Sequence, residues 1–254
     1  MSLKAAVIGV GAMGQHHARV YADLSEGELV AVADANANAG AAIGKKYGTK
    51  SYTDYQEMLS TEKPDLVSIA VPTSLHMEVA QHVIQAGCHL LIEKPIAATL
   101  EEGQKLIDEA KAANVKLMVG HIERFNPAVQ QLKERLMKKE LGQVRYIEAR
   151  RQGPYPTRIT DTGVVLDLAV HDLDIISFVT DAKIENLYAE IEACVGEHED
   201  LLSSIVRLEG GIIGNININW ITPVKIRELY ITGEAGTFHV NYLTQDLTFF
   251  QNEE

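Results

Sequence analysis

Gly9-Val10-Gly11-Ala12-Met13-Gly14 follows an apolar run near the N-terminus and has the spacing G-x-G-x-x-G. In a strand–turn–helix unit, Gly9 permits the tight turn, Gly11 lets the backbone approach a pyrophosphate, and Gly14 lets helix and strand pack closely. Asp34 lies 20 residues beyond Gly14, at the end of the next apolar run, where a carboxylate can accept hydrogen bonds from ribose hydroxyls. We therefore expect a dinucleotide site at residues 9–14 and Asp34.

The residues around Asp34 indicate which dinucleotide binds. A 2′-phosphate would be repelled by the Asp34 carboxylate, and Ala35-Asn36-Ala37-Asn38 contains no Arg or Lys to offset that charge. The pyrophosphate would lie at a helix N-terminus, where unpaired N–H groups favour negative charge. The predicted cofactor is therefore NAD. The alternative, a glycine-rich turn in an α/β protein that binds another ligand, is disfavoured by the combination of strand, helix and acidic residue.

The first half of the chain alternates short apolar runs with amphipathic stretches such as Leu100–Ala113. The runs that we predict as strands are Lys4–Gly9, Leu29–Ala33, Leu66–Ala70, His89–Ile92 and Lys116–Val119. Each is apolar almost throughout, which is typical of strands buried on both faces of a parallel sheet. Repeated β–α units with right-handed crossovers predict a doubly wound sheet of the Rossmann type.

The pattern changes after Gly120. Asn126-Pro127 begins a predicted helix that runs to about Lys139, and another helix is predicted around Val165–Val179. Isoleucine and asparagine alternate within Ile212–Ile221, a period of two that is typical of an antiparallel sheet with one buried face. We therefore predict an α/β chain of two domains. Residues 1–122 form the Rossmann domain, and residues 123–254 form an α+β domain with a largely antiparallel, open sheet.

Composition disfavours several classes of partner. The chain of 254 residues carries a net charge of −12, which repels nucleic acid and anionic membranes. Its apolar runs are far shorter than the roughly 20 residues that span a bilayer. Its two cysteines are too few for a disulfide framework, and its N-terminus lacks the layout of a signal peptide. These features predict a cytoplasmic protein that acts on a small molecule.

The candidate catalytic residues are Lys94, Asp167 and His171. Taking hydride from an alcohol carbon requires a base for the hydroxyl proton and a group that stabilises the developing alkoxide. Asp167 and His171 are four residues apart, so a helix places them on one face, where the carboxylate can orient the imidazole. Lys94 follows a parallel strand, at the edge where open α/β sheets bind ligands. We predict that His171 is the general base, Asp167 orients it, and Lys94 polarises the hydroxyl.

Each of these residues has an alternative interpretation. Lys94 could be a surface lysine after a strand, and His171 could be a helix histidine with its hydrogen bonds satisfied. Asp167, His171, Asp172 and Asp174 could suggest a metal site, but these aspartates cannot all face one ion from a single helix. No metal is therefore predicted.

Three motifs stand out. Glu93-Lys94-Pro95 and the stretch Gly120–Pro127 each follow a predicted strand, and Asp167-x-x-x-His171, between Gly163 and Asp174, lies within the second predicted helical segment. On these motifs the chain resembles the glucose–fructose oxidoreductase / inositol dehydrogenase / MocA (Gfo/Idh/MocA) family. The resemblance implies oxidation or reduction of sugars and cyclitols with a nicotinamide cofactor. It also implies a homo-oligomer, dimer or tetramer, formed through the open sheet. In the family the lysine and the histidine share the acid–base role, so which of them carries the proton stays open.

Further stretches are similar to a narrower group, the UDP-N-acetylglucosamine 3-dehydrogenases and related UDP-amino-sugar 3-dehydrogenases. These stretches are Val71–His76, His121–Pro127, Arg150–Pro156 and Asp167–Asp172. With the fingerprint, the resemblance implies cofactor contacts from Gly9, Val10, Gly11, Ala12, Met13, Gly14, Asp34, Val71, Pro72, Thr73, His76, Glu93, Lys94 and Pro95. It implies substrate contacts from Lys94, Arg124, Asn126, Arg151, Tyr155, Arg158, Asp167 and His171.

Arginines cluster around the predicted substrate side of a chain that is otherwise acidic. Arg124, Arg150, Arg151 and Arg158 could bind the diphosphate of a nucleotide sugar, because guanidinium binds phosphate in a bidentate manner. Tyr155 could line the same pocket. The alternative for each arginine is ion pairing on the surface.

The predicted function is oxidation of the 3-hydroxyl of UDP-N-acetylglucosamine, or of a related UDP-amino sugar, by hydride transfer to NAD. One alternative is a cyclitol or free-sugar dehydrogenase, which would not need the arginines. The other is a non-catalytic NAD-binding redox regulator, which would not need the three candidate catalytic residues. Family members usually continue for several dozen residues past the position of Glu254. We therefore expect either a shorter protein or a substrate domain that is incomplete here at its C-terminus.

Overall fold

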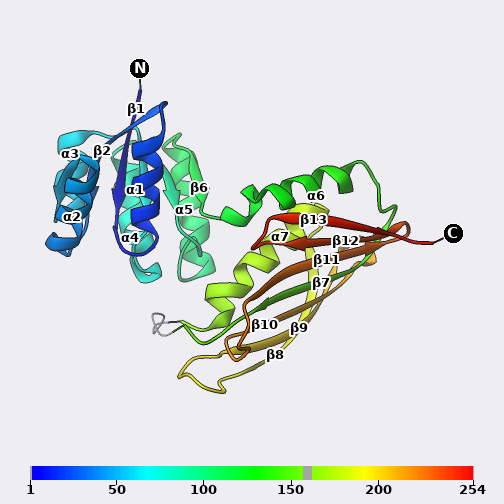
Figure 1. Cartoon of the computed structure of the whole chain (residues 1–254). Coiled ribbons are helices and arrows are strands. Elements are labelled where there is room, and N and C mark those ends of the chain that lie inside the picture. Colours follow the sequence, from blue (N-terminus) through cyan, green and yellow to red (C-terminus); the bar gives the residue numbers. More distant parts are fainter. Residues whose placement is uncertain (1, 157–161, 254) are drawn as a thin grey trace. The chain divides into compact units, whose positions relative to one another are not determined.

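The structure is a computed structural model that describes residues 2–156 and 162–253, and the chain divides into two compact units, residues 1–120 and 121–254 (Figure 1). The elements of the first unit are β1 (Leu3–Ile8), α1 (Gly14–Asp23), β2 (Gly27–Ala33), α2 (Ala37–Tyr47), β3 (Lys50–Tyr52), α3 (Tyr55–Glu62), β4 (Leu66–Ile69), η1 (Thr73–Leu75), α4 (His76–Gln85), β5 (His89–Ile92), α5 (Leu100–Ala112) and β6 (Leu117–Val119).

The first unit is a doubly wound parallel sheet, as predicted. Its six strands lie in the order β3-β2-β1-β4-β5-β6, and every neighbouring pair is parallel. The chain winds outward in both directions from β1 and β4, so the crevice at their carboxyl ends is the position where such sheets bind ligands. Strand β3 was not predicted, because its three residues are largely exposed and form no apolar run.

Local signals set several of the element boundaries. Thr99 accepts a hydrogen bond from the Glu102 amide at 3.2 Å and begins α5, as the capping-box pattern predicts. Gly48 ends α2 with φ of +65°, a left-handed conformation that glycine adopts without steric cost. The apolar strands are buried in the centre of the sheet, where β1 and β4 contribute residues that are almost fully inaccessible.

The second unit is a mixed α/β unit. Its elements are η2 (Ile122–Phe125), α6 (Pro127–Met137), β7 (Val144–Gln152), η3 (Val165–Ala169), α7 (Val170–Thr180), β8 (Ile184–Glu192), β9 (Leu201–Leu208), η4 (Glu209–Gly211), β10 (Ile213–Asn219), β11 (Ile226–Gly233), β12 (Gly236–Asn241) and β13 (Asp246–Gln251). Asn126 accepts a hydrogen bond from the Ala128 amide at 3.1 Å and begins α6, with Pro127 in its first turn as predicted.

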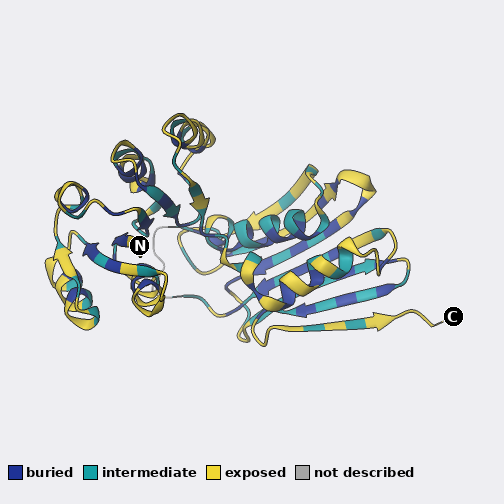
Figure 2. Ribbon diagram, turned by 90° about the horizontal axis from the view of Figure 1, so that it is seen from above, coloured by how far each residue is buried: buried dark blue, intermediate teal, exposed yellow. Residues whose placement is uncertain are grey.

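One sheet forms the body of this unit, in the order β13-β12-β11-β7-β10-β9-β8. All neighbours are antiparallel except β7 and β10, which confirms the prediction of a largely antiparallel sheet. Helix α6 packs against β12 and β13, and α7 packs against β7, so the helices cover one face. Buried and exposed residues alternate along the strands (Figure 2), as expected when only one face is covered.

Over the described part of the chain, no helix is both long enough and apolar enough to cross a membrane.

Candidate active site

The glycine turn joins β1 to α1 and meets the packing conditions of a dinucleotide fingerprint. Gly9 has φ of +82°, and a Cβ there would lie 2.6 Å from the Ala70 carbonyl oxygen. A Cβ on Gly14 would lie 1.7 Å from the Gly9 carbonyl oxygen, so neither position can carry a side chain. A Cβ on Gly11 would meet no atom within 4 Å. The turn therefore has an open approach to its backbone at Gly11, which is what a bound pyrophosphate requires.

Asp34 directly follows β2 and helps to fix the conformation of the glycine turn. Its Oδ2 accepts a hydrogen bond from the Val10 amide at 2.8 Å, and its Oδ1 accepts one from the Asn36 amide at 2.8 Å. An ionised carboxylate has about four acceptor positions, so Asp34 can still accept hydrogen bonds from ribose hydroxyls. The same side chain therefore organises the turn and presents negative charge where a 2′-phosphate would otherwise fit.

A cavity of about 440 Å³ lies at the carboxyl ends of β1, β2 and β4. The residues that line it include Gly9, Gly11, Asp34, Asp54, Tyr55, Val71, Pro72 and Leu75. Apolar walls with a few polar groups are typical of a small-molecule site. The cavity and the open Gly11 backbone fit the adenosine and pyrophosphate of NAD. Ala12 and Met13 complete the turn, and Thr73 begins η1 after the cavity wall.

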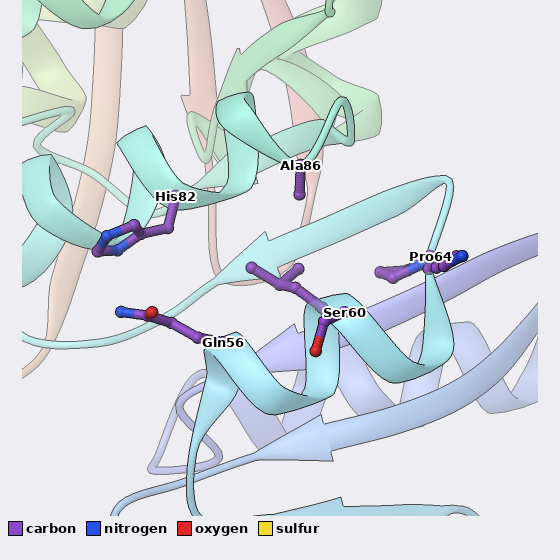
Figure 3. A pocket seen from close by; sticks show the side chains of 7 residues that line it. Gln56, Ser60, Pro64, His82 and Ala86 are labelled. Atoms are coloured by element: carbon purple, nitrogen blue, oxygen red, sulfur yellow. The ribbon is translucent and has the colours of Figure 1, made fainter.

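A second hollow, of about 470 Å³, lies between α3 and α4 (Figure 3). Side chains from both helices face it, among them Gln56, Ser60 and His82. It shares no lining residue with the cavity at Asp34 and contains none of the predicted site residues. We therefore place the nucleotide site at the Asp34 cavity.

Glu93 and Lys94 follow β5, and the Lys94–Pro95 peptide bond is cis. Glu93 is 8% exposed. Its Oε1 lies 2.8 Å from Nε2 of His17 on α1, and its Oε2 accepts a weak hydrogen bond from the Lys94 amide at 3.3 Å. Burial raises the pKa of Glu93, but the bond to His17 and the nearby positive charges lower it by more, so the net shift is downward. Both carboxylate oxygens of Glu93, which was predicted to contact the cofactor, therefore contact other residues of the first unit.

His76 begins α4 and is only 1% exposed. Its Nδ1 lies 2.8 Å from the Pro95 carbonyl oxygen, and its Nε2 lies 3.0 Å from the Val71 carbonyl oxygen. His76 was predicted to contact the cofactor. In the structure, both of its ring nitrogens contact carbonyl oxygens of Val71 and Pro95, two other residues that were predicted to contact the cofactor.

Asp167 and His171 lie in the second unit, at the junction of two helix types. Asp167 belongs to η3, a π-helical turn, and His171 belongs to the first turn of α7. Single π-helical turns within helices occur frequently at functional sites. Four residues correspond to about one turn, so the two residues remain on one side of the helix.

Arg151 occupies a buried position on β7, facing the helices. Its Nε donates to Asp172 Oδ2 at 2.7 Å, its Nη2 to Asp172 Oδ1 at 3.2 Å, and its Nη1 to Glu123 Oε1 at 3.1 Å. Burial lowers the pKa of Arg151, but the Asp172 carboxylate raises it by more. Arg151 was predicted to bind substrate, yet its side chain is only 5% exposed and is bonded to these carboxylates. The sequence left ion pairing on the surface open as the alternative; the structure shows Arg151 in an ion pair that is buried.

The other predicted substrate residues lie in varied surroundings. Arg124 Nε donates to Asp174 Oδ2 at 2.8 Å, and its side chain is 41% exposed. Asn126 is buried and donates from Nδ2 to the Tyr242 carbonyl at 3.2 Å while it caps α6. Tyr155 packs edge-on against Trp220, with ring centroids 5.7 Å apart. Arg158 lies outside the described residues.

Arg227 was not predicted, although it lies beside Arg151. Arg227 on β11 lies opposite Arg151 on the neighbouring strand β7, and its Nη1 donates to the Gln152 carbonyl at 2.7 Å. Burial and the neighbouring Arg151 charge lower the pKa of Arg227 to about 10, although the charges of Asp172, Glu123 and Asp167, in that order, act to raise it. A signal for Arg227 exists in the sequence: it precedes the apolar Leu229 by two residues, so a strand places both side chains on the same face. His17 was likewise missed, because only the fold brings it to Glu93.

Among the residues described, no three His, Cys, Asp or Glu side chains are grouped so that they could hold a metal ion.

Comparison with known proteins identifies both units. Residues 3–121 match the Gfo/Idh/MocA model described as "Oxidoreductase family, NAD-binding Rossmann fold", and residues 129–239 match the "GFO/IDH/MocA C-terminal domain". The chain is 33% identical over 248 residues to UDP-N-acetylglucosamine 3-dehydrogenase of Acidithiobacillus ferrooxidans, covering 98% of this chain and 77% of that protein. It is 33% identical over 188 residues to D-glucoside 3-dehydrogenase of Escherichia coli, covering 70% of this chain and 54% of that protein.

A solved structure of the A. ferrooxidans UDP-N-acetylglucosamine 3-dehydrogenase has the same fold. It superposes with a TM-score of 0.91 at 32% identity and covers 99% of this chain and 80% of that chain.

Proposed function

This chain belongs to the Gfo/Idh/MocA oxidoreductase family, and on that basis we propose that it oxidises the 3-hydroxyl of UDP-N-acetylglucosamine or of a related UDP-amino sugar. It is an NAD-dependent dehydrogenase that acts on CH–OH groups. The observation that carries the choice of substrate is the likeness to UDP-N-acetylglucosamine 3-dehydrogenase, which extends over 98% of the chain in sequence and 99% in fold.

The first unit supplies the cofactor site. The backbone at Gly11 receives the pyrophosphate, and Asp34 accepts hydrogen bonds from the adenosine ribose. Val71 and Pro72 line the cavity beside them. NAD held by these residues would supply the acceptor for the hydride of the carbon that carries the reacting hydroxyl.

Lys94, Asp167 and His171 are assigned to the deprotonation of that hydroxyl. Lys94 hydrogen-bonds the hydroxyl oxygen and stabilises the negative charge that develops on it. His171 accepts the proton, and Asp167 orients the imidazole. The π-helical turn at Asp167 supports this assignment, because such turns are frequent at functional sites.

Substrate binding falls to the polar residues of the second unit. Arg124 is paired with Asp174 but is exposed enough to bind a phosphate as well. Arg151 is buried and holds Asp172, the residue that follows His171, in place. The uncovered face of the sheet, with exposed Tyr146 and Ile205, mediates homo-oligomerisation in this proposal.

Turnover with defined sugars tests the function. The protein is incubated with NAD and UDP-N-acetylglucosamine, UDP-glucose, a methyl glucoside or myo-inositol, and NADH is followed by its absorbance. UDP-N-acetylglucosamine is expected to give the highest kcat/KM. Tight NAD binding without NADH from any sugar would contradict the proposal and favour a regulator.

Two variants test the assigned roles. Lys94→Met and His171→Ala are expected to bind NAD as the wild type does and to lose roughly 100-fold or more in kcat, the scale of general acid–base contributions. His16→Ala changes an exposed histidine on α1 and serves as the matched control for His171→Ala. Unchanged rates in either variant would remove that residue from the mechanism.

A glucoside 3-dehydrogenase is the second candidate function. It is favoured by the 33% identity to D-glucoside 3-dehydrogenase, although the match covers 70% of this chain. The methyl glucoside in the substrate panel distinguishes it from the leading proposal.

A further inference from the structure

Lys94 lies between two residues that each contact a histidine from a different helix, and we propose that His17 and His76 are positioning residues for the Lys94 side chain. His17 contacts Glu93, which precedes the lysine, and His76 contacts Pro95, which follows it. The inference rests on the role proposed above for Lys94.

The contact before Lys94 comes from α1. His17 Nε2 lies 2.8 Å from Glu93 Oε1, and its Nδ1 lies 3.1 Å from the Ser68 hydroxyl on β4. The Ser68 hydroxyl lies 2.8 Å from the hydroxyl of Tyr21 on the same helix. Both ring nitrogens of His17 are therefore occupied, which fixes its ring and, through it, the Glu93 carboxylate that accepts the Lys94 amide hydrogen.

Gly120 lies beside the same carboxylate and leaves space for it. A Cβ at Gly120 would lie 3.1 Å from Glu93 Oε2, so this glycine leaves room for the carboxylate and little more. A larger residue at position 120 would therefore crowd the carboxylate that contacts both His17 and the Lys94 amide.

The contact after Lys94 comes from α4. His76 Nδ1 lies 2.8 Å from the Pro95 carbonyl oxygen, and its Nε2 lies 3.0 Å from the Val71 carbonyl oxygen. Val71 lines the nucleotide cavity. His76 thus connects the lysine-bearing loop directly to the loop beside the cofactor.

These contacts specify more than packing. A leucine could fill the volume of either buried ring, but only a side chain with nitrogen at these positions can contact the Glu93 carboxylate or both carbonyls. The lysine has a long and flexible side chain, so the reach of its amine depends on where the backbone on both sides is held. A displacement of about 1 Å in a catalytic group can cost about 100-fold in rate.

The test compares His17→Leu, His76→Leu and the double variant with two matched controls. His16→Leu changes an exposed neighbour on α1, and His89→Leu changes a half-buried histidine on β5 whose Nδ1 accepts a hydrogen bond from the Lys116 amide at 3.1 Å. We expect the double variant to lose about 10- to 100-fold in kcat while KM for the sugar and Kd for NAD change little. The controls keep the wild-type kcat.

The effect must also depend on the lysine. In a Lys94→Met background, adding both histidine substitutions should lower the residual kcat by less than about twofold, because groups that act as one unit are not additive. A full multiplicative loss in that background would overturn the proposal, as would a wild-type kcat in the folded double variant. If the leucine variants do not fold, His17→Asn and His76→Asn, whose amides are too short to make the same contacts, must show the same loss of kcat.

A measurement without substrate separates this inference from the proposed function. Lysines are reductively methylated with ¹³C, and the Lys94 signal is assigned by its absence in Lys94→Met. With NAD bound, the signal should move toward those of exposed lysines when both histidines are replaced; an unmoved signal would overturn the inference. If the wild type oxidises none of the sugars, the proposed function fails while this spectrum still decides the role of the histidines.

Discussion

Replacing Arg151 by methionine removes the cation from a buried ion pair and should strongly destabilise the second unit. The side chain of Asp172 is 1% exposed, and the Arg151 guanidinium contacts both of its oxygens, at 2.7 and 3.2 Å. Removing one partner of a buried pair costs about 3–5 kcal/mol, because the remaining charge is shielded from water and has lost its hydrogen-bonded counterion. For a chain of this size each kcal/mol shifts Tm by roughly 2–4 °C, so we expect Tm to fall by about 6–20 °C.

Arg150→Met is the matched control, since Arg150 immediately precedes Arg151 on β7 and its side chain lies on the other face of the sheet. Its side chain is 37% exposed and lies 3.7 Å from Glu228, and an ion pair of this kind contributes about 0–1 kcal/mol. Arg151→Met combined with Asp172→Leu should recover most of the lost stability, because apolar replacement of a whole buried pair is often neutral.

Thermal unfolding followed by circular dichroism or calorimetry measures all three variants. Equal Tm values for Arg151→Met and Arg150→Met would refute this reasoning. A weaker affinity for UDP-N-acetylglucosamine with no loss of Tm would instead return Arg151 to the substrate site for which it was first predicted.

Four further predictions concern the cofactor turn and acid stability. Gly11→Ala should keep its Tm but lose roughly 10-fold or more in NAD affinity by calorimetric titration, since its Cβ would enter the open space above the turn. Gly14→Ala should fail to fold the first unit, because its Cβ would lie 1.7 Å from the Gly9 carbonyl oxygen, and a wild-type Tm would argue against that packing. Asp34→Ala should lower both Tm and NAD affinity, because two backbone N–H groups lose their acceptor; loss of affinity alone would limit Asp34 to the ribose. Burial raises the pKa of Asp200, but three backbone N–H groups lower it by more, so its stabilisation is present above the ordinary value of 3.8 and is lost as pH falls through the folded value. Asp200→Asn should therefore flatten the fall of Tm below pH 4, and an unchanged acid profile would contradict this.

Patterns short enough to be read along the chain predicted most of the fold. The glycine spacing at residues 9–14 and the acidic residue at 34 predicted the turn and its neighbouring strand, because a tight turn and a close helix admit no side chain at fixed positions. Runs that are apolar throughout predicted a parallel sheet, and the alternation in residues 212–221 predicted one with a single covered face. These signals are local, since they depend on the backbone geometry of one element at a time.

Pairings between distant residues could not be obtained in the same way. His17 reaches Glu93 across 76 positions, and Arg151 reaches Asp172 across 21, and no spacing rule relates these residues. In the sequence, Arg151 resembles its neighbour Arg150, and His17 resembles its neighbour His16. Strand pleating and helix rotation turn one member of each pair inward, and burial then makes its hydrogen bonds obligatory, because an unpaired charge in the interior costs far more than one in water.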